Sequence, residues 1–247
     1  MQKTILFLFL ALSISGFAQT GTTKKDGGLL NKANGILKKA SGGGSALSND
    51  EIIAGLKEAL SVGANNSSQK LAAVDGFFAN AAIKVLMPEE AKKVESTLRS
   101  AGMGSMVDKA ILSMNRAAEE ASKSAAPIFL DAIKGMSFQD ALSILKGTDT
   151  AATGYLRGKT SGALTTAFKP VIDAALEKTN ATKYWKDVFE TYNKLPTTFK
   201  KVNTDLSGYV TDKALGGLFY QVALEEQKIR KDPAARVTDV LKKVFAN

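Results

Sequence analysis

The stretch ALGGLFYQVAL, residues 214–224, carries no charge and lies between Lys213 and two acidic residues. In and just beyond it, apolar residues recur at the three- and four-residue spacing of one helix face: Leu215, Leu218, Phe219, Val222 and Ile229. Ala214, Ala223 and Leu224 carry apolar surface onto the other faces. A helix that is apolar nearly all round is typical of one buried among other helices. We therefore expect the rest of the chain to pack around this segment.

Two details of this segment lead to structural expectations. Thr211 precedes it, and its hydroxyl can accept a hydrogen bond from the amides of the first turn, so we predict that Thr211 is the N-cap. Gly216 and Gly217 each cost about 1 kcal/mol relative to alanine inside a helix. That cost is tolerable if a neighbouring backbone crosses closely, and we expect such a crossing there.

The composition is that of an ordinary globular protein, with 247 residues, 45% hydrophobic and 23% charged. Cysteine and histidine are both absent, which excludes disulfides, thiolate nucleophiles, imidazole bases and Cys/His metal sites. No motif calls for a cofactor, and we expect none. The net charge is +9, but about half of the excess left after removal of the amino terminus lies in a short leader. We therefore expect no nucleic-acid partner.

The amino terminus has the pattern of a secretory signal peptide. Lys3 supplies the positive charge, residues 5–14 are apolar apart from Ser13, and small residues precede the expected cleavage point after Ala18. The apolar run is shorter than the ~20 residues that a membrane-spanning helix needs. We predict a cleavable signal peptide over residues 1–18 and export to the periplasm.

Residues 19–47 are predicted to be a flexible, basic, glycine-rich leader. Within it, Leu29 to Ala40 has an apolar stripe with three lysines off it. A basic amphipathic helix of this kind can lie on an anionic membrane. The alternatives are that the segment docks a few leucines on the folded body or has no fixed structure, because a dozen residues form only a marginal isolated helix.

Residues 48–247 are predicted to form one all-α domain, a single multi-helix bundle packed around the buried C-terminal helix. Ser48 and Glu51 have capping-box spacing at its start. We expect a helix from there, followed by helices over 88–102, 107–135 with a kink or restart at Pro127, 137–147, 149–157, 161–178 bent at Pro170, and 182–195. A loop over 196–205, the central helix and a last helix after Asp232-Pro233 complete the prediction. No segment alternates as a strand does.

Several strings of this body are similar to those of a known bacterial family. They are GLKEAL (55–60), VDGFF (74–78), SMNRAAE (113–119), IFLDAI (128–133), DALSILKG (140–147), YVTDKALGGLF (209–219) and IRKDPAARVTDVLKKVF (229–245). The chain resembles domain-of-unknown-function family number 4197. That resemblance implies an exported, helix-rich protein, and it brings no assigned activity, cofactor or catalytic residue.

Asn115 and Arg116 form the first candidate site. Asn115 lies close to the apolar stripe of its predicted helix, so its amide needs hydrogen-bond partners, for which a loop backbone is suitable. Arg116 can reach Glu119 or Glu120 on the same helix. The pair could hold an anionic ligand in a cleft. A network that locks helices together is the favoured alternative.

A second candidate set lies near the carboxy terminus and consists of Glu225, Glu226, Arg230, Asp232 and Arg236. Glu226 and Arg230 have the i,i+4 spacing of a helical ion pair, and Arg236 can reach Asp232. We expect these residues to fix the angle between the last two helices rather than to catalyse a reaction.

Carboxylate chemistry needs neither histidine nor cysteine, since two acids suffice for glycoside cleavage. Asp131, Asp140, Glu225 and Glu226 could supply such a pair. Two short motifs give even weaker evidence for an enzyme. Residues 154–160 lack the glycine spacing and the preceding strand of a phosphate loop. Residues 67–70 have the S-x-x-K spacing of serine acyl-enzymes but lack the companion motifs.

The leading hypothesis is a non-enzymatic, periplasmic all-α module that binds an envelope protein or a small ligand. The first alternative is a membrane-surface protein that makes weak contact with anionic lipid through Leu29 to Ala40. The second alternative is a carboxylate-dependent hydrolase.

Overall fold

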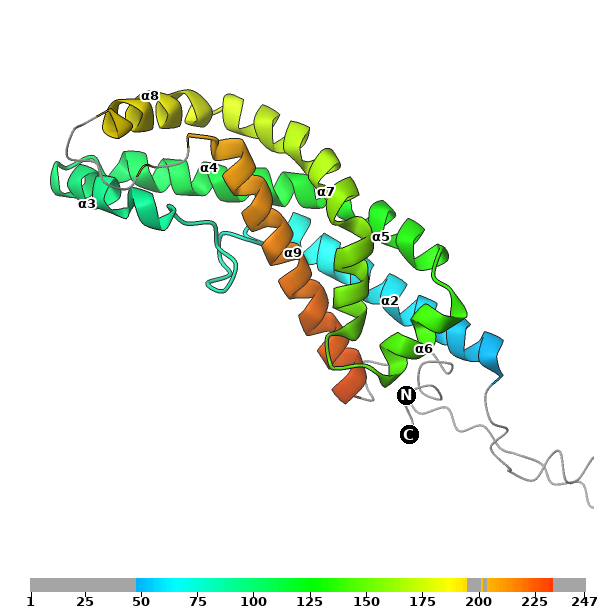
Figure 1. Cartoon of the computed structure of the whole chain (residues 1–247). Coiled ribbons are helices and arrows are strands. Elements are labelled where there is room, and N and C mark those ends of the chain that lie inside the picture. Colours follow the sequence, from blue (N-terminus) through cyan, green and yellow to red (C-terminus); the bar gives the residue numbers. More distant parts are fainter. Residues whose placement is uncertain (1–47, 195–200, 202–203, 233–247) are drawn as a thin grey trace, which may run out of the picture. The chain divides into compact units, whose positions relative to one another are not determined.

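The computed structural model describes residues 48–194, 201 and 204–232. This part is helical without any strand, so the predicted all-α class is confirmed. Its elements are α2 (Asn49–Ala72), the 3₁₀ turn η1 (Glu89–Ala91), α3 (Lys92–Ser100), α4 (Gly104–Ser122), α5 (Ala125–Lys134), α6 (Phe138–Lys146), α7 (Ala151–Glu177), α8 (Ala181–Asn193) and α9 (Leu206–Lys231). Figure 1 shows their arrangement.

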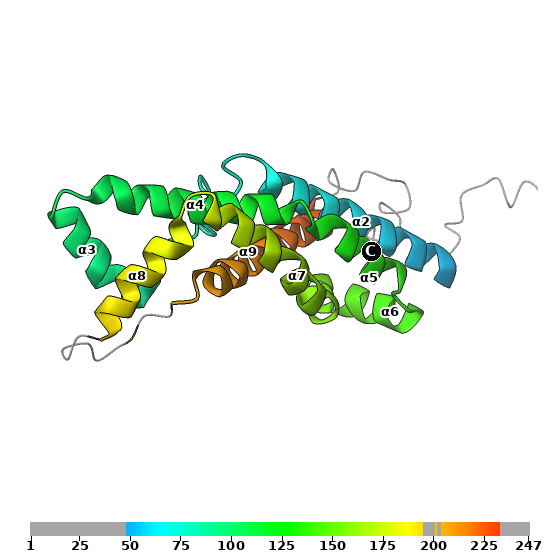
Figure 2. The same ribbon diagram turned by 90° about the horizontal axis from the view of Figure 1, so that it is seen from above.

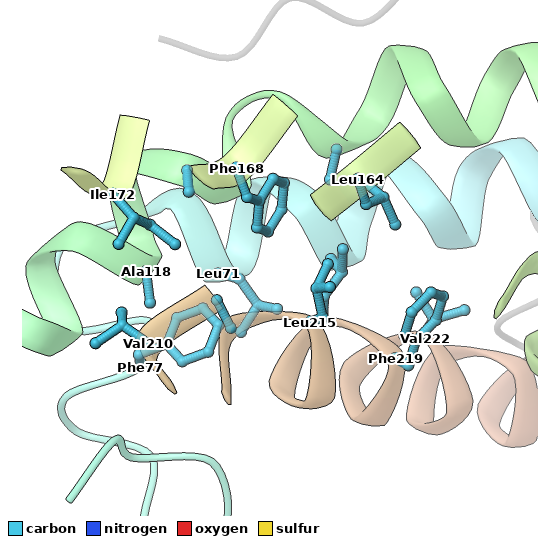
Figure 3. Close-up of a cluster of buried hydrophobic side chains, with 14 of the residues drawn as sticks. Leu71, Phe77, Ala118, Leu164, Phe168, Ile172, Val210, Leu215, Phe219 and Val222 are labelled. Carbon is cyan, nitrogen blue, oxygen red and sulfur yellow. The ribbon is translucent and has the colours of Figure 1, made fainter. Parts of the chain in front are cut away.

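The bundle packs around α9, as the uncharged stretch predicts. This helix contacts α2, α4, α7 and α8, and its inner face is buried along its length. Phe219 of α9 meets Phe129 of α5 edge to face, with ring centroids 5.9 Å apart. Figure 3 shows α9 side chains such as Val210 and Phe219 gathered with Phe168 of α7. Burial is not complete, because Tyr220 on the outer edge is 42% exposed.

The start of α9 differs from the prediction. Asp205 is the N-cap, and its carboxylate accepts a hydrogen bond from the amide of Gly208 at 2.8 Å. Thr211 lies inside the helix and is buried, so its prediction as the N-cap is wrong. An aspartate further upstream fits the same capping chemistry and extends the helix by a turn and a half.

The double glycine of α9 is explained by one close approach. A Cβ added to Gly217 would lie 2.5 Å from a ring carbon of Phe77, whereas one added to Gly216 would meet nothing within 4 Å. The expected crossing backbone is therefore not what these glycines accommodate, although Gly217 does have a close neighbour. That neighbour is an aromatic side chain from the 73–88 segment rather than a crossing helix backbone.

Helix α7 is continuous from Ala151 to Glu177, so the predicted division between residues 157 and 161 is wrong. Gly158 lies on its exposed side, where a glycine removes no packing. The buried face continues across this point at helical spacing through Leu156, Thr160 and Leu164. Tertiary packing of that face outweighs the weak local preference of glycine.

The other helix ends follow the local signals closely. Capping boxes form at Ser48 with Glu51 and at Ser137 with Asp140. The chain breaks between α4 and α5 just before Pro127, which confirms the predicted restart. Pro88 is the N-cap of η1 rather than the first helical residue, because its ψ of 156° is extended.

Helix α3 ends in a Schellman motif. Gly102 has a φ of +80°, the left-handed conformation that glycine adopts without strain. The amide of Met103 donates to the carbonyl of Leu98 at 2.9 Å, and the amide of Gly102 donates to that of Arg99 at 3.1 Å. The predicted stop at Gly102 is confirmed, and the reversal sets α3 against the beginning of α4.

Some predictions lie outside the described residues. These are the signal peptide over residues 1–18, the leader over 19–47 with its amphipathic segment, most of the 196–205 loop, and the last helix after Asp232. They stay predictions. None of the helices in the described ranges has the length and apolar character needed to cross a membrane.

Candidate functional site

Asn115 fastens the 73–88 segment to α4. Its side chain is fully buried and bonds Val85 twice, accepting from the amide at 2.9 Å and donating to the carbonyl at 2.8 Å. It also donates to the carbonyl of Ile111 at 2.7 Å. The expected loop-backbone partner is therefore present. The Asn115 side chain offers no hydrogen-bonding group to a ligand, because its oxygen and both of its N–H groups already form hydrogen bonds within the protein.

Arg116 and Glu119 fasten the same segment one turn further along. The Glu119 side chain is only 4% exposed and accepts from the amides of Phe77 and Phe78 at 3.1 and 3.2 Å. Arg116 donates to Glu119 at 2.6 Å and to Asp75 at 2.7 Å. These charge-assisted bonds raise the pKa of the Arg116 guanidinium. The geometry is that of a network locking a loop to a helix.

Glu226 and Arg230 join three helices at the other end of the bundle. The Glu226 carboxylate, 5% exposed, accepts from the amides of Ala152 and Thr153 at 3.0 and 2.8 Å and from the Thr153 hydroxyl at 2.8 Å. It therefore caps the N-terminus of α7 from α9, where a negative charge is favourable. Arg230 donates to Glu226 at 2.8 Å and to the carbonyl of Ile144 near the end of α6, also at 2.8 Å.

The remaining candidates do not converge on a common point. Asp131 is exposed and pairs with Lys134, while Asp140 serves the capping box of α6, where its hydrogen bonds from Ser137 lower its pKa. Glu225 is half-buried and accepts from Gln221 at 3.4 Å. Asp232 is the exposed C-cap of α9, and Arg236 lies outside the described residues.

These contacts define what the candidate residues can do. The two buried carboxylates, Glu119 and Glu226, each accept hydrogen bonds on both oxygens from backbone amides, a hydroxyl or guanidinium groups. Neither oxygen pair is directed at open space. Within the ranges that the structure describes, no group of three acidic side chains is placed to hold a metal ion.

A groove of about 800 Å³ is lined by residues of α3, α4 and α8. Figure 2 shows α3, α8 and the beginning of α4 at one end of the bundle. Helix α4 provides half of its lining, α3 and α8 provide further residues, and Met87, the end of α7 with the two residues after it, and the first residue of α9 complete it. The volume is within the range of about 300–1,000 Å³ that small-molecule sites have. The groove is the candidate functional site.

The lining of the groove is mostly apolar. Val94 and Leu98 of α3 and Trp185 and Phe189 of α8 line it, and the last two rings stack at a tilt with centroids 4.5 Å apart. Met106 of α4 also lines it and is 54% exposed, so the groove reaches solvent. Two further methionines line it, and their flexible thioethers can adapt to an irregular apolar ligand.

The polar groups of the groove are few. Ser113 of α4 and Thr179, just after α7, share a hydrogen bond of 2.6 Å. Lys109 and Lys178 contribute cationic side chains. Arg116 also borders the groove, whereas the other described residues that the sequence marks as candidate site residues lie away from it.

The groove was not predicted from the sequence, although one signal for it was present. Met106 and Leu112 of α4 lie off its buried stripe, line the groove and remain exposed. A second apolar surface on a helix that already has a core-facing stripe is evidence for a binding surface. The contributions of Trp185 and Phe189 were not predictable, because they depend on where α8 packs.

Comparison with known proteins gives one family. The family described as "Protein of unknown function (DUF4197)" matches residues 46–246, which is most of the chain. The chain belongs to this family. The resemblance stated from the sequence strings is thereby confirmed, and the DUF4197 assignment brings no activity with it. Neither the curated proteins nor the solved structures gave a significant match.

Proposed function

We propose that this DUF4197 protein is a non-enzymatic, exported binding module whose ligand site is the groove between α3, α4 and α8. One observation carries the proposal: about 800 Å³ of mostly apolar space, reached from solvent, at one end of the helical body. Concave apolar sites of this size with a few polar groups are typical of small-ligand binding.

The engaged carboxylates favour binding over turnover. General acid–base catalysis needs a carboxyl group within reach of a substrate proton. Glu119 and Glu226 are buried and direct their oxygens at backbone amides and arginines, and neither lines the groove. Export to the periplasm rests on the signal-peptide pattern of residues 1–18.

Trp185, the only tryptophan of the chain, lines the groove, so its fluorescence can report binding there. Titration with the uncharged apolar dye N-phenyl-1-naphthylamine should quench Trp185 fluorescence in a saturable way. Ala110, half-buried on α4, lines the groove. Ala110→Phe fills this space and should weaken dye binding by roughly tenfold, the effect of overpacking by about 1–3 kcal/mol.

The matched control is Ala163→Phe, which adds the same side chain to an exposed position of α7 that does not line the groove. It should bind the dye as the unchanged protein does. Equal binding by the Ala110→Phe variant, with its fold verified by circular dichroism, would show that the groove is not the site.

A further inference from the structure

We infer that the ligand of the groove is a single-chain amphiphile with an anionic head group, held by Lys109 and Lys178. This inference rests on the proposed function and deepens it by naming the class of ligand. It depends on how the charges around the groove are neutralised and on the apolar surface beside them.

The acidic groups of the groove already have cationic partners within the protein. Glu95 pairs with Arg99 at 2.9 Å, a guanidinium that it shares with Asp108, and Glu120 pairs with Lys123 at 2.6 Å. The guanidinium of Arg116 is likewise held by carboxylates on two sides. These three groove residues therefore offer little uncompensated charge to a ligand.

Lys109 and Lys178 differ from them. Both line the groove and both are exposed, and neither forms an ion pair within the part of the chain that the structure describes. Their positive charge is therefore available to a ligand. An anionic group placed beside them could form ion pairs with two cations that have no such partner among the described residues.

The backbone brings the two lysines to the same region. Lys109 and Ser113 lie one turn apart on α4 and so share a helix face. Ser113 bonds Thr179, which directly follows Lys178. Lys109 is thus one helical turn, and Lys178 one residue, from the Ser113–Thr179 hydrogen bond. The two lysines therefore lie near the same contact although they are far apart in the sequence.

The rest of the lining is suited to a hydrocarbon chain. Leu98, Met106 and Trp185 present apolar surface that an acyl chain can cover. Burying a methylene is worth up to roughly a fourfold gain in affinity, so two added carbons should give about a tenfold gain. An apolar groove next to two available cations matches a fatty-acid-like molecule better than an uncharged hydrophobe or a cationic one.

The test uses the full chain and competition against N-phenyl-1-naphthylamine, followed through Trp185. The ligands are dodecanoate, dodecanol and dodecyltrimethylammonium, all below their micellar or solubility limits. Dodecanoate should bind roughly tenfold more tightly than dodecanol, because each exposed ion pair contributes about a two- to fivefold gain. Decanoate should bind about tenfold more weakly than dodecanoate.

The double variant Lys109→Gln/Lys178→Gln should bind dodecanoate no better than dodecanol, and its affinity for dodecanol should not change. The matched control is Lys146→Gln/Lys228→Gln, which removes two exposed lysines that do not line the groove and should leave every affinity unchanged. Raising the salt concentration should reduce the preference for dodecanoate in the unchanged protein only.

The outcomes separate this inference from the function on which it rests. Equal affinity for dodecanoate and dodecanol, with dye binding still blocked by Ala110→Phe, overturns the inference and leaves the groove as a binding site. Absence of saturable binding by any of these ligands and by the dye overturns both. Displacement of the dye by an excess of the protein itself would show that a second copy occupies the groove, which also overturns the inference.

Discussion

At the scale of single residues, the fold relies on polar side chains that replace missing backbone partners. The 73–88 segment forms no helix or sheet, yet its amides at Phe77, Phe78 and Val85 are held by Glu119 and Asn115 of α4. A buried amide without a partner costs free energy comparable to a lost hydrogen bond. The two side chains therefore define the path of this segment.

Asn115→Leu should lower the free energy of unfolding by about 2–4 kcal/mol, because the amide and carbonyl of Val85 would both remain buried without a side-chain partner. Urea denaturation followed by circular dichroism measures the loss. Asn66→Leu makes the same change at an exposed position of α2 and should change stability by less than about 0.5 kcal/mol. A similar small change for Asn115→Leu would contradict this role.

Tyr209 should make the stability of the protein sensitive to alkaline pH. Burial, followed by the charges of Glu90 and Glu89, raises the pKa of Tyr209 to about 12, and its hydroxyl donates to the carbonyl of Leu86 at 2.9 Å. Since the unfolded pKa is about 10, the native state favours the neutral phenol. Its contribution is complete below pH 10 and is lost as the pH rises toward 12.

The measurement compares the free energy of unfolding of the unchanged protein and Tyr209→Phe on both sides of this window. The stability advantage of tyrosine over phenylalanine should shrink as the pH rises from about 9 to about 11.5. Absorbance of ionised tyrosine should show that the variant has lost a group that titrates at about pH 12. A constant difference between the two proteins across the window would be inconsistent with the raised pKa.

At the scale of elements, charged side chains of one helix cap the ends of other helices. Glu226 of α9 caps the first amides of α7, and Arg230 of the same helix bonds a carbonyl near the end of α6. Each contact satisfies groups that a helix end leaves without an intrahelical partner. The pair therefore sets how α6, α7 and α9 meet, a role close to the angle-fixing role expected from the sequence.

Glu226→Gln should cost about 3–5 kcal/mol, because it removes the buried charge that binds Arg230 and the first amides of α7. Arg230→Met should cost less, since Glu226 would keep three hydrogen bonds from Ala152 and Thr153. Thermal and urea unfolding give the order of stability. Glu225→Gln is the control at the neighbouring, half-buried position, and a loss there as large as at Glu226 would contradict the capping role.

At the scale of the whole described domain, the core and the groove use different parts of the bundle. Helices α4, α7 and α9 have the buried faces that make up most of the core cluster, while α3 has no buried residue and packs mainly on η1 and α4. Few buried contacts indicate a low free energy of local opening. The groove is therefore bordered by one of the least anchored elements.

Amide hydrogen exchange on the full chain should show this difference directly. The amides of α3 (Lys92–Ser100) should exchange faster than those of α4 and α9, and dodecanoate should slow them. Helix α6, which does not line the groove, is the internal control and should not respond. Exchange of α3 as slow as that of α9 in the absence of ligand would contradict the assignment of α3 as weakly anchored.

The sequence alone determined the helical class, the capping box at Ser48, the helix start at Ser137, the stop at Gly102 and the central position of the uncharged helix. These features depend on residues a few positions apart, whose spacing and backbone preferences act locally. It also indicated that Asn115 needs a backbone partner, because a buried amide must be satisfied.

Only the tertiary structure decided the continuity of α7 through Gly158, the contact of Phe77 with Gly217 and the groove itself. Each depends on surfaces brought together from distant parts of the chain, and packing there outweighs local propensity. Lys109 and Lys178 carry no pattern in the sequence. They line the same groove because Ser113 and Thr179 meet, where α4 passes the end of α7.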